Sequence, residues 1–314
     1  MRYVLLSFLV YISYFLYSSD IDNYFINYNK SDGLVHKTVN CMMQDRDGFL
    51  WIGTSNGISR FDGYSFRNFK HDRKNPLSLN GISVLGMVEG KDGRLWLSTN
   101  VGIEYFDKNT ETFQLSSIPE IKDNKFDRNI YIDERGLIWI NNSNTNIIAF
   151  DPKTQKIQYH ITNIPGITIS SVYQYIVQND TLWIACKDGI VAYNFRKQSL
   201  RFIDKESSLS YCFSIHKIDN SRIVMSFMND GVYVLNTAKK EGYWVDKKTI
   251  EKKIGIKTII YDATIGYDNS LWIGVSSGTI NLKNNIFEYY NNYSQDKYFD
   301  GDLVWNIYRD FDNN

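Results

Sequence analysis

The chain has few cysteines and no excess of charge of either sign. Its 3 cysteines, Cys41, Cys186 and Cys212, are odd in number and far apart, so they form no disulfide framework and lack metal-site spacing. Lys plus Arg and Asp plus Glu number 35 each, which leaves no positive excess to neutralise a nucleic-acid backbone. We therefore expect no nucleic-acid partner, and we expect the cysteines to act as small buried hydrophobic residues.

Recognisable catalytic and metal-binding motifs are missing too. The 4 histidines (His36, His71, His160 and His216) share no spacing, and no H-E-x-x-H, G-x-S-x-G, P-loop or kinase pattern occurs. Asp45-Arg46-Asp47-Gly48 resembles the start of a calcium loop but lacks the further oxygen ligands and the distal glutamate. We predict a strand-connecting turn there, and no cofactor, metal or catalytic residue in this chain. A carboxylate pair for glycoside cleavage stays open, because acidic residues are numerous.

One long hydrophobic run occurs, at the N-terminus. Arg2 precedes an apolar run of fifteen residues, Tyr3 to Tyr17, which only Ser7 and Ser13 interrupt. A membrane-spanning helix needs about 20 residues, so this run is short for one. We predict that residues 1–19 are a signal peptide that exports the chain. An uncleaved N-terminal anchor is the alternative.

The rest of the chain consists of a repeat of about 44 residues. A tryptophan between two aliphatic residues recurs at Trp51, Trp96, Trp139, Trp183 and Trp272, and Met225 takes its place in the fifth copy, so that the position returns every 42 to 47 residues. Six positions later stands a glycine: Gly57, Gly102, Gly189, Gly231 and Gly278, with Asn146 one position late in the third copy. Gly and Asn tolerate a positive φ, which a tight hairpin turn requires.

Each repeat contains four short strand-like runs joined by turns, and this pattern is typical of a propeller blade. We predict an all-β fold: a β-propeller of four-stranded antiparallel blades, nominally seven-bladed, with six complete blades and an incomplete seventh. Within residues 20–314 the blades are expected at about 39–70, 84–116, 129–162, 171–204, 211–246 and 257–291. Packing of blade on blade should bury the tryptophans.

The two ends of the propeller carry single strand-like segments. Residues 303–314 match the first strand of a seventh blade, so the chain is interpreted as a fragment that stops inside a repeat. Residues 23–28 resemble a fourth strand instead. We expect this N-terminal segment to close the ring by pairing with the last blade, because such pairing protects exposed strand edges.

The first repeat resembles the two-component regulator propeller family. The run from Asp45 to Thr54 matches the family's D-x-x-G-x-L-W-I-G-T core, and the run from Gly57 to Gly63 matches its glycine turn and R-Y/F-D segment. Ser31-Asp32-Gly33-Leu34 is similar to the family's opening segment, and the likeness extends over about residues 22–314. The third and fifth repeats depart furthest from the pattern.

This resemblance implies a sensing role outside the inner membrane. Members of the family place paired seven-bladed propellers before a β-sandwich, a transmembrane helix, a histidine kinase and often a receiver with a DNA-binding domain. They respond to carbohydrate breakdown products. The resemblance therefore implies a periplasmic ligand-sensing region of a hybrid two-component receptor, here without its kinase and itself not an enzyme. Its implied partners are an oligosaccharide, a second propeller and the downstream signalling domains of the same receptor.

The turns between the second and third strands are the expected ligand-binding region. They should gather around one end of the channel, where amide, hydroxyl and charged groups could hydrogen-bond sugar hydroxyls. The candidates are Asn56, Asn100, Asn142, Asn144, Lys187, Asp188, Asn229 and Ser276. Ordinary solvated turn chemistry is the alternative interpretation.

Two other functions stay open at this point. Some propellers that resemble this one are lyases, a function that would need a histidine and a glutamate on one face. A protein–protein interaction scaffold is the second alternative. Tyr289, Tyr290 and Tyr293 could serve a homodimer or a neighbouring propeller, but we favour packing of this outer strand against the N-terminal strand.

Overall fold

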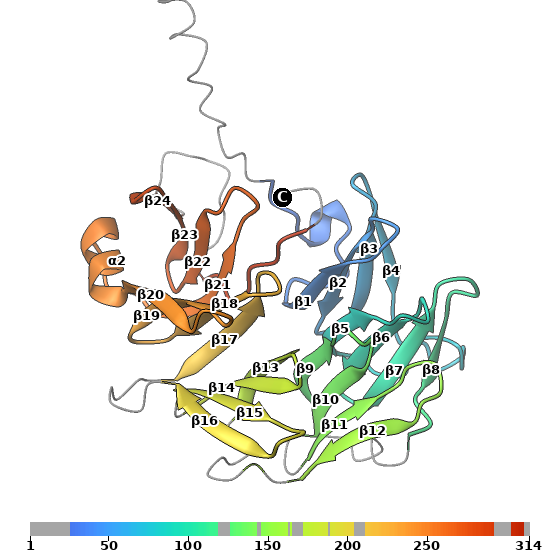
Figure 1. Ribbon diagram of the computed structural model, residues 1–314. Helices are drawn as coiled ribbons and strands as arrows, with labels where there is room; N and C mark the ends of the chain where they lie inside the picture. The colour runs from blue at the N-terminus through green and yellow to red at the C-terminus, as the bar shows by residue number, and fades with distance from the viewer. Residues whose placement is uncertain are drawn as a thin grey trace, which may run out of the picture.

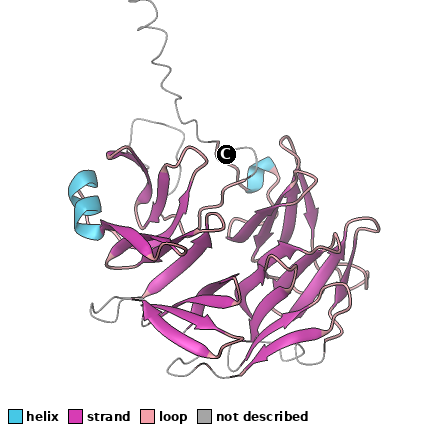
Figure 2. Cartoon of the chain, viewed as in Figure 1, coloured by secondary structure: helices cyan, strands magenta, loops and turns pink. Residues whose placement is uncertain are grey.

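The computed structural model describes residues 26–118, 126–142, 146–162, 164, 172–187, 189–203, 211–291 and 303–310. Within these residues the chain forms six four-stranded antiparallel sheets arranged around a central axis (Figure 1). Strands dominate the fold, and the helices are limited to the one-turn η1 (Lys30–Asp32) and to α2 (Lys247–Ile254) at the periphery (Figure 2). The predicted β-propeller with four-stranded antiparallel blades is confirmed.

The blades follow one another along the chain, and we number them 1 to 6. Blades 1 to 3 contain, in order, β1 (Val39–Gln44), β2 (Leu50–Thr54), β3 (Gly57–Phe61), β4 (Phe66–Phe69); β5 (Val84–Glu89), β6 (Leu95–Thr99), β7 (Gly102–Asp107), β8 (Thr112–Leu115); β9 (Phe126–Ile132), β10 (Ile138–Asn142), β11 (Asn146–Phe150) and β12 (Ile157–Ile161). Blades 4 to 6 contain β13 (Val172–Gln178), β14 (Thr181–Cys186), β15 (Gly189–Asn194), β16 (Ser199–Ile203); β17 (Cys212–Lys217), β18 (Arg222–Phe227), β19 (Gly231–Asn236), β20 (Glu241–Asp246); β21 (Ile260–Ile265), β22 (Leu271–Val275), β23 (Gly278–Lys283) and β24 (Ile286–Tyr290). The first strand of each blade lies nearest the axis (Figure 1), and we call it the inner strand.

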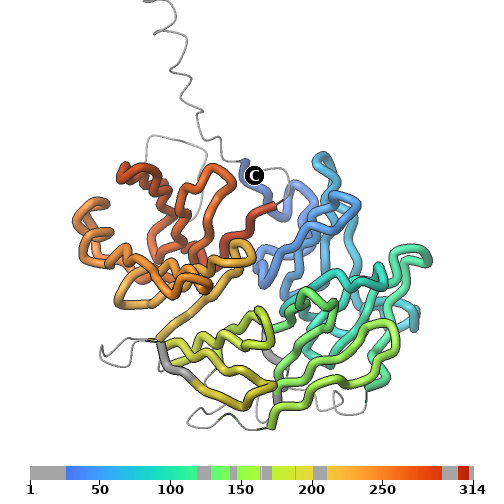
Figure 3. Tube along the Cα trace, viewed as in Figure 1, coloured from blue at the N-terminus to red at the C-terminus, as the bar shows by residue number. Residues whose placement is uncertain are grey.

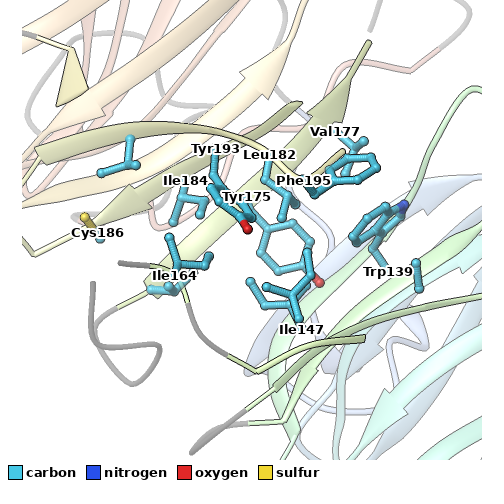
Figure 4. Packing of buried hydrophobic residues seen from close by; sticks show 14 residues of the cluster. Trp139, Ile147, Ile164, Tyr175, Val177, Leu182, Ile184, Cys186, Tyr193 and Phe195 are labelled. Carbon is cyan, nitrogen blue, oxygen red and sulfur yellow. The ribbon is translucent and has the colours of Figure 1, made fainter. Parts of the chain in front are cut away.

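The repeated tryptophans join neighbouring blades. Trp51 is fully buried and its ring lies 5.3 Å from that of Phe106 in blade 2, while Trp96 lies 5.1 Å from Phe150 in blade 3. Figure 4 shows the same contact between blades 3 and 4, where Trp139 approaches Phe195 within a cluster that includes Tyr175 and Val177. Such aromatic contacts add to the burial of apolar area and stabilise each seam.

The indole nitrogens are bonded to the turn that precedes them. Trp51 Nε1 donates to Asp45 Oδ2 at 2.8 Å, and Trp139 Nε1 donates to Asp133 Oδ2 at 3.0 Å. Asp45 also accepts hydrogen bonds from the backbone amides of Asp47 and Phe49, so its carboxylate stabilises the turn. Asp45-Arg46-Asp47-Gly48 is thus a strand-connecting turn that orients the tryptophan.

The seam after blade 6 differs from the first three. Trp272, like Trp183 of blade 4, is only partly buried, and its ring stacks at 6.1 Å on Tyr290 of its own blade. Residues 303–310 lie between β21 and β1 (Figure 3) and carry no regular secondary structure, so the predicted first strand of a seventh blade is not formed there. We call residues 303–310 the closing segment.

The prediction that residues 23–28 pair with the last blade is wrong for the part of that segment that can be described. Residues 26–28 form no strand, and Tyr28 packs instead on Phe61 and Phe66 of blade 1, with ring centroids 4.8 and 5.6 Å away. Phe61 at the end of β3 and Phe66 at the start of β4 form an aromatic pair, and this pair contacts the ring of Tyr28. Residues 23–25 and the predicted signal peptide, residues 1–19, lie outside the described residues.

Candidate functional site

The inner strands share one irregularity, a β-bulge near the end at which they begin. In blade 4, Val172 pairs with Cys186 and Gln174 with Ala185, which leaves Tyr173 as an extra residue. The extra residues in blades 1, 2, 4, 5 and 6 are Asn40, Leu85, Tyr173, Phe213 and Tyr261. A bulge releases its extra residue from the ladder and re-aims the side chain. The side chains at these positions can therefore have a role other than strand pairing.

The bulges lie at one end of the ring. Each inner strand begins opposite the end of its second strand, as Val39 pairs with Thr54. The extra residues thus lie beside the turns between second and third strands, and we call this end the top face. The predicted ligand-binding turns are on the same face.

In blades 4 to 6 the extra residues are aromatic and touch one another in sequence. Tyr173 and Phe213 stack with centroids 5.4 Å apart and ring planes at 14°, and Phe213 meets Tyr261 edge-on at 5.7 Å. Trp305 of the closing segment continues the row at 4.5 Å from Tyr261, and Tyr211 lies 6.0 Å from Tyr173 at the other end. Because inner strands surround the axis (Figure 1), this row runs partway around the axis on the top face. We call these five residues the aromatic arc.

The rings of the aromatic arc remain accessible. Tyr173, Tyr211, Phe213 and Tyr261 are half-buried, and Trp305 is 53% exposed. Aromatic rings pair a large apolar face with, in tyrosine and tryptophan, a polar edge. A pyranose ring offers the matching surface, an apolar face of C–H groups bordered by hydroxyls. The arc can therefore stack on sugar rings while its hydroxyl and indole groups meet their polar rim.

The bulge positions of blades 1 and 2 have a different character. Leu85 is aliphatic, and Asn40 is used in the seam, where its Nδ2 donates to Val84 O at 2.9 Å and lies 3.3 Å from Ser83 Oγ. The bulge positions are thus aromatic in blades 4 to 6, where Trp305 of the closing segment adjoins them, and not aromatic in blades 1 and 2.

An ion pair crosses between blades at the far end of the inner strands. Lys217 of blade 5 pairs with Glu134 of blade 3, although these blades are not neighbours, and Lys91 of blade 2 donates to the backbone oxygen of Glu134 at 2.9 Å. These contacts join three blades at the end opposite the aromatic arc.

Two of the predicted ligand-binding side chains hold the backbone of the top face. Asn100 Oδ1 accepts from the amides of Ile82 and Ser83 at 2.8 and 2.9 Å. Ser276 Oγ accepts from Ile259 N at 3.1 Å in the equivalent place of blade 6. Each side chain fixes the start of the inner strand of its own blade, β5 or β21, which is a structural role.

The other predicted turn residues divide into three groups. Lys187 is exposed and its Nζ lies 5.9 Å from the ring of Tyr211, so it stands at one end of the aromatic arc. Asn56 and Asn229 are exposed on the turns of blades 1 and 5. Asn144, Asp188 and the side chain of Asn142 lie outside the described residues.

A buried carboxylate links the arc to its surroundings. Asp262, next to Tyr261 and 1% exposed, accepts from His216 Nε2 at 2.6 Å and from Ile307 N of the closing segment at 2.8 Å. Burial lowers the pKa of His216, but the charge of Asp262 and its hydrogen bond outweigh this, and the pKa is raised above 6.5. Among the described residues no cluster of three or more metal-ligating side chains occurs.

The aromatic arc was not predicted from the sequence. A signal was nevertheless present, because an aromatic residue follows the first residue of three successive inner strands and recurs in the closing segment: Val172-Tyr173, Cys212-Phe213, Ile260-Tyr261 and Val304-Trp305. A bulge cannot be located from residue types alone. Only the folded ring shows that these aromatic residues occupy bulges and lie next to one another.

Comparison with known proteins supports the repeat and the fold. The profile of the family described as two component regulator propeller matches residues 33–56. Histidine kinase P4 of Formosa agariphila is 32% identical over 56 residues, which is 18% of this chain and 4% of that protein. The extracellular domain of a hybrid two component system from B. thetaiotaomicron superposes with a TM-score of 0.74 at 18% identity, covering 92% of this chain and 40% of that one.

A second extracellular domain of a hybrid two component system from B. thetaiotaomicron gives a TM-score of 0.69 at 15% identity, over 92% of this chain and 37% of its own. The chain thus spans well under half the length of the solved domains it matches and a small fraction of the matched kinase. At these identities the solved structures establish the propeller fold. Within the described residues, no helix combines the length and the apolar character that crossing a bilayer requires.

Proposed function

Since the likeness to the two component regulator propeller family is confirmed in sequence and in fold, we propose that this chain is the ligand-sensing propeller of an extracytoplasmic receptor that signals through a histidine kinase. Export through residues 1–19 would place it in the periplasm. A second propeller and the signalling domains of the same receptor would be its partners, with a homodimer as the assembled form. The ligand is an oligosaccharide bound on the top face.

The aromatic arc is the observation that carries this proposal. Its rings contact one another at 4.5 to 6.0 Å across blades 4, 5 and 6 and the closing segment. A continuous row of this kind suits a linear ligand with several repeating rings better than a single small molecule. Stacking on an aromatic ring contributes about 1 kcal/mol beyond area burial, so several contacts together give a useful affinity.

The test is titration of the exported chain with a panel of neutral and acidic oligosaccharides, followed by calorimetry and tryptophan fluorescence. We expect at least one of them to bind. Phe213→Ala and Tyr261→Ala should each weaken that binding by about tenfold, which corresponds to about 1.4 kcal/mol. Circular dichroism and melting temperature show whether each variant is folded.

Tyr64→Ala is the matched control, because Tyr64 is 96% exposed on the turn between β3 and β4, away from the top face. This variant should bind like the wild type. Full affinity in both folded arc variants would refute the arc as the binding site. A protein partner recovered by pull-down, together with no response to any sugar, would favour the interaction scaffold.

A further inference from the structure

The closing segment occupies the position of an inner strand, between blade 6 and blade 1. Val304 lies against Gly274 of β22, where an added Cβ would be 3.0 Å from Val304 Cγ1. Val84 of β5 lies against Gly53 of β2 in the same way, at 2.9 Å. The segment therefore packs on blade 6 as β5 packs on blade 1.

The hydrogen bonds of the closing segment repeat those between complete blades. Ile307 N donates to Asp262 Oδ2, just as Ile215 N of blade 5 donates to Gln174 Oε1 of blade 4 at 3.0 Å. Val304 N donates to Val275 O at 3.2 Å, and an Arg309 guanidinium nitrogen donates to Ile265 O at 2.8 Å. These bonds attach the segment to blade 6 along its length.

The closing segment also reaches blade 1. Gln44 N of β1 donates to Tyr308 Oη at 2.9 Å, and Tyr308 packs against the cluster of blades 1 and 2 that contains Met43 and Trp51. One segment thus bridges the two ends of the ring of blades. Trp305, three residues before Tyr308, is at the same time the last member of the aromatic arc.

The closing segment belongs to no sheet within the described residues. β1, β5 and the other inner strands each pair with the second strand of their own blade, whereas no strand in the described part of the chain forms a ladder with residues 303–310. The segment is held here by its bonds to Asp262, Val275, Ile265 and Gln44.

From this arrangement, and resting on the proposed function, we propose that ligand binding is coupled to ring closure. An oligosaccharide stacked on Tyr261 and Trp305 holds the closing segment on blade 6, and Tyr308 transmits this to blade 1. Asp262 acts as a positioning residue, because its bond to Ile307 N sets the place of Trp305 beside Tyr261. A ligand that prefers the closed state stabilises that state by its binding free energy.

Hydrogen exchange tests the coupling. The amides of Ile307 and Gln44 report the two ends of the closing segment, because they donate to Asp262 and Tyr308. With a binding oligosaccharide at twenty times its Kd, both amides should exchange about twentyfold more slowly. The amide of Ile215 is the matched control, because it makes the equivalent bond between two complete blades, and its exchange should stay unchanged.

Three variants test the individual contacts of the closing segment. Trp305→Ala should abolish the ligand-dependent slowing at both amides. Tyr308→Phe removes the acceptor of Gln44 N, so the ligand should still slow Ile307 but no longer Gln44. Asp262→Asn should raise the exchange rate of Ile307 without ligand and weaken binding.

The outcomes distinguish the two proposals. Binding that weakens in Phe213→Ala but leaves Ile307 and Gln44 unprotected would overturn the coupling and leave the sensing function standing. Equal slowing at Ile215 would also overturn the coupling, because it would indicate general stabilisation. Absence of binding by any oligosaccharide would overturn both proposals.

Discussion

At the scale of single residues, the turn glycines show how the backbone restricts the sequence. All five repeated glycines have a positive φ, from 103° at Gly189 to 144° at Gly102. Three of them also lie close to the outer strand: a Cβ on Gly57 would be 2.5 Å from Phe69 O, one on Gly231 would be 2.3 Å from Val245 O, and one on Gly278 would be 2.1 Å from Tyr290 O. Conformation and space therefore both require glycine at these positions.

Gly278→Ala should lower the free energy of unfolding by about 3 kcal/mol, because it adds both backbone strain and a clash with a neighbouring strand. Urea unfolding measures the loss. Gly63→Ala is the control: Gly63 also has a positive φ, of 94°, but no atom lies within 4 Å of an added Cβ. Its cost should be about 1 kcal/mol. Equal losses would show that the contact with β24 does not matter.

His216 should make stability depend on pH. Because its pKa in the folded state is raised above 6.5, the stabilisation from the pair with Asp262 is complete below that value and is lost as pH rises through the raised pKa. The difference in melting temperature between the wild type and His216→Gln should therefore shrink from pH 5 towards pH 9. His160→Gln, at an exposed position of β12, is the control. A difference that does not vary with pH would contradict this prediction.

At the scale of the strand and the blade, the tryptophan position depends on the following blade. Trp51 packs on Phe69 of its own blade and on Phe106 of the next, whereas Trp272 stacks on Tyr290 of its own blade and is partly exposed. The same residue in the same register thus contributes differently to stability.

Trp51→Ala should lower the free energy of unfolding by about 4 kcal/mol, the usual range for removing a buried aromatic side chain from a core. Trp272→Ala should cost about 1 to 2 kcal/mol, because less area is lost from burial. Both values come from urea unfolding followed by circular dichroism. A larger loss for Trp272 than for Trp51 would show that the seam after blade 6 is as well packed as the others.

The sequence predicted the blades and their turns because the same pattern occurs six times. The tryptophan and glycine positions recur because every blade has the same seam and the same turn, so six imperfect copies reveal one structure. The aromatic arc escaped prediction because the bulge residue differs among copies, from Asn40 and Leu85 to Tyr173 and Phe213. The position of residues 26–28 was not predicted, because Tyr28 packs on Phe61 and Phe66 and a strand pattern does not indicate such a contact.

The predicted binding turns show a related difficulty. An exposed amide such as Asn100 is equally suited to a ligand and to a neighbouring backbone, and residue type does not distinguish them. In the folded chain its oxygen receives two amides from the loop that leads into β5. Lys187, by contrast, stands beside Tyr211 at the end of the aromatic arc, and it remains a candidate ligand contact.

At the scale of the whole molecule, the ring is held closed through a few residues. Val304 packs on Gly274 while the neighbouring Asn306 is exposed. Val304→Asp should release the closing segment, because it would bury a charge without a partner. Limited proteolysis should then cleave within residues 303–310 at least tenfold faster than in the wild type. Asn306→Asp, the matched control, should be cleaved at the wild-type rate, and equally slow cleavage of both variants would contradict this role of Val304.

Because of the bulges, the inner strands contain residues that do not take part in strand pairing beside residues that hold the blade together. The extra residue of a bulge lies outside the strand register, so in blades 4 to 6 it can be exchanged without shifting that register, whereas Asn40 of blade 1 is bonded to the seam. Relatives with this scaffold could acquire new ligands by altering only these few side chains. A chimera that carries another receptor's residues at positions 173, 213 and 261 should then acquire that receptor's preference while retaining its own melting temperature.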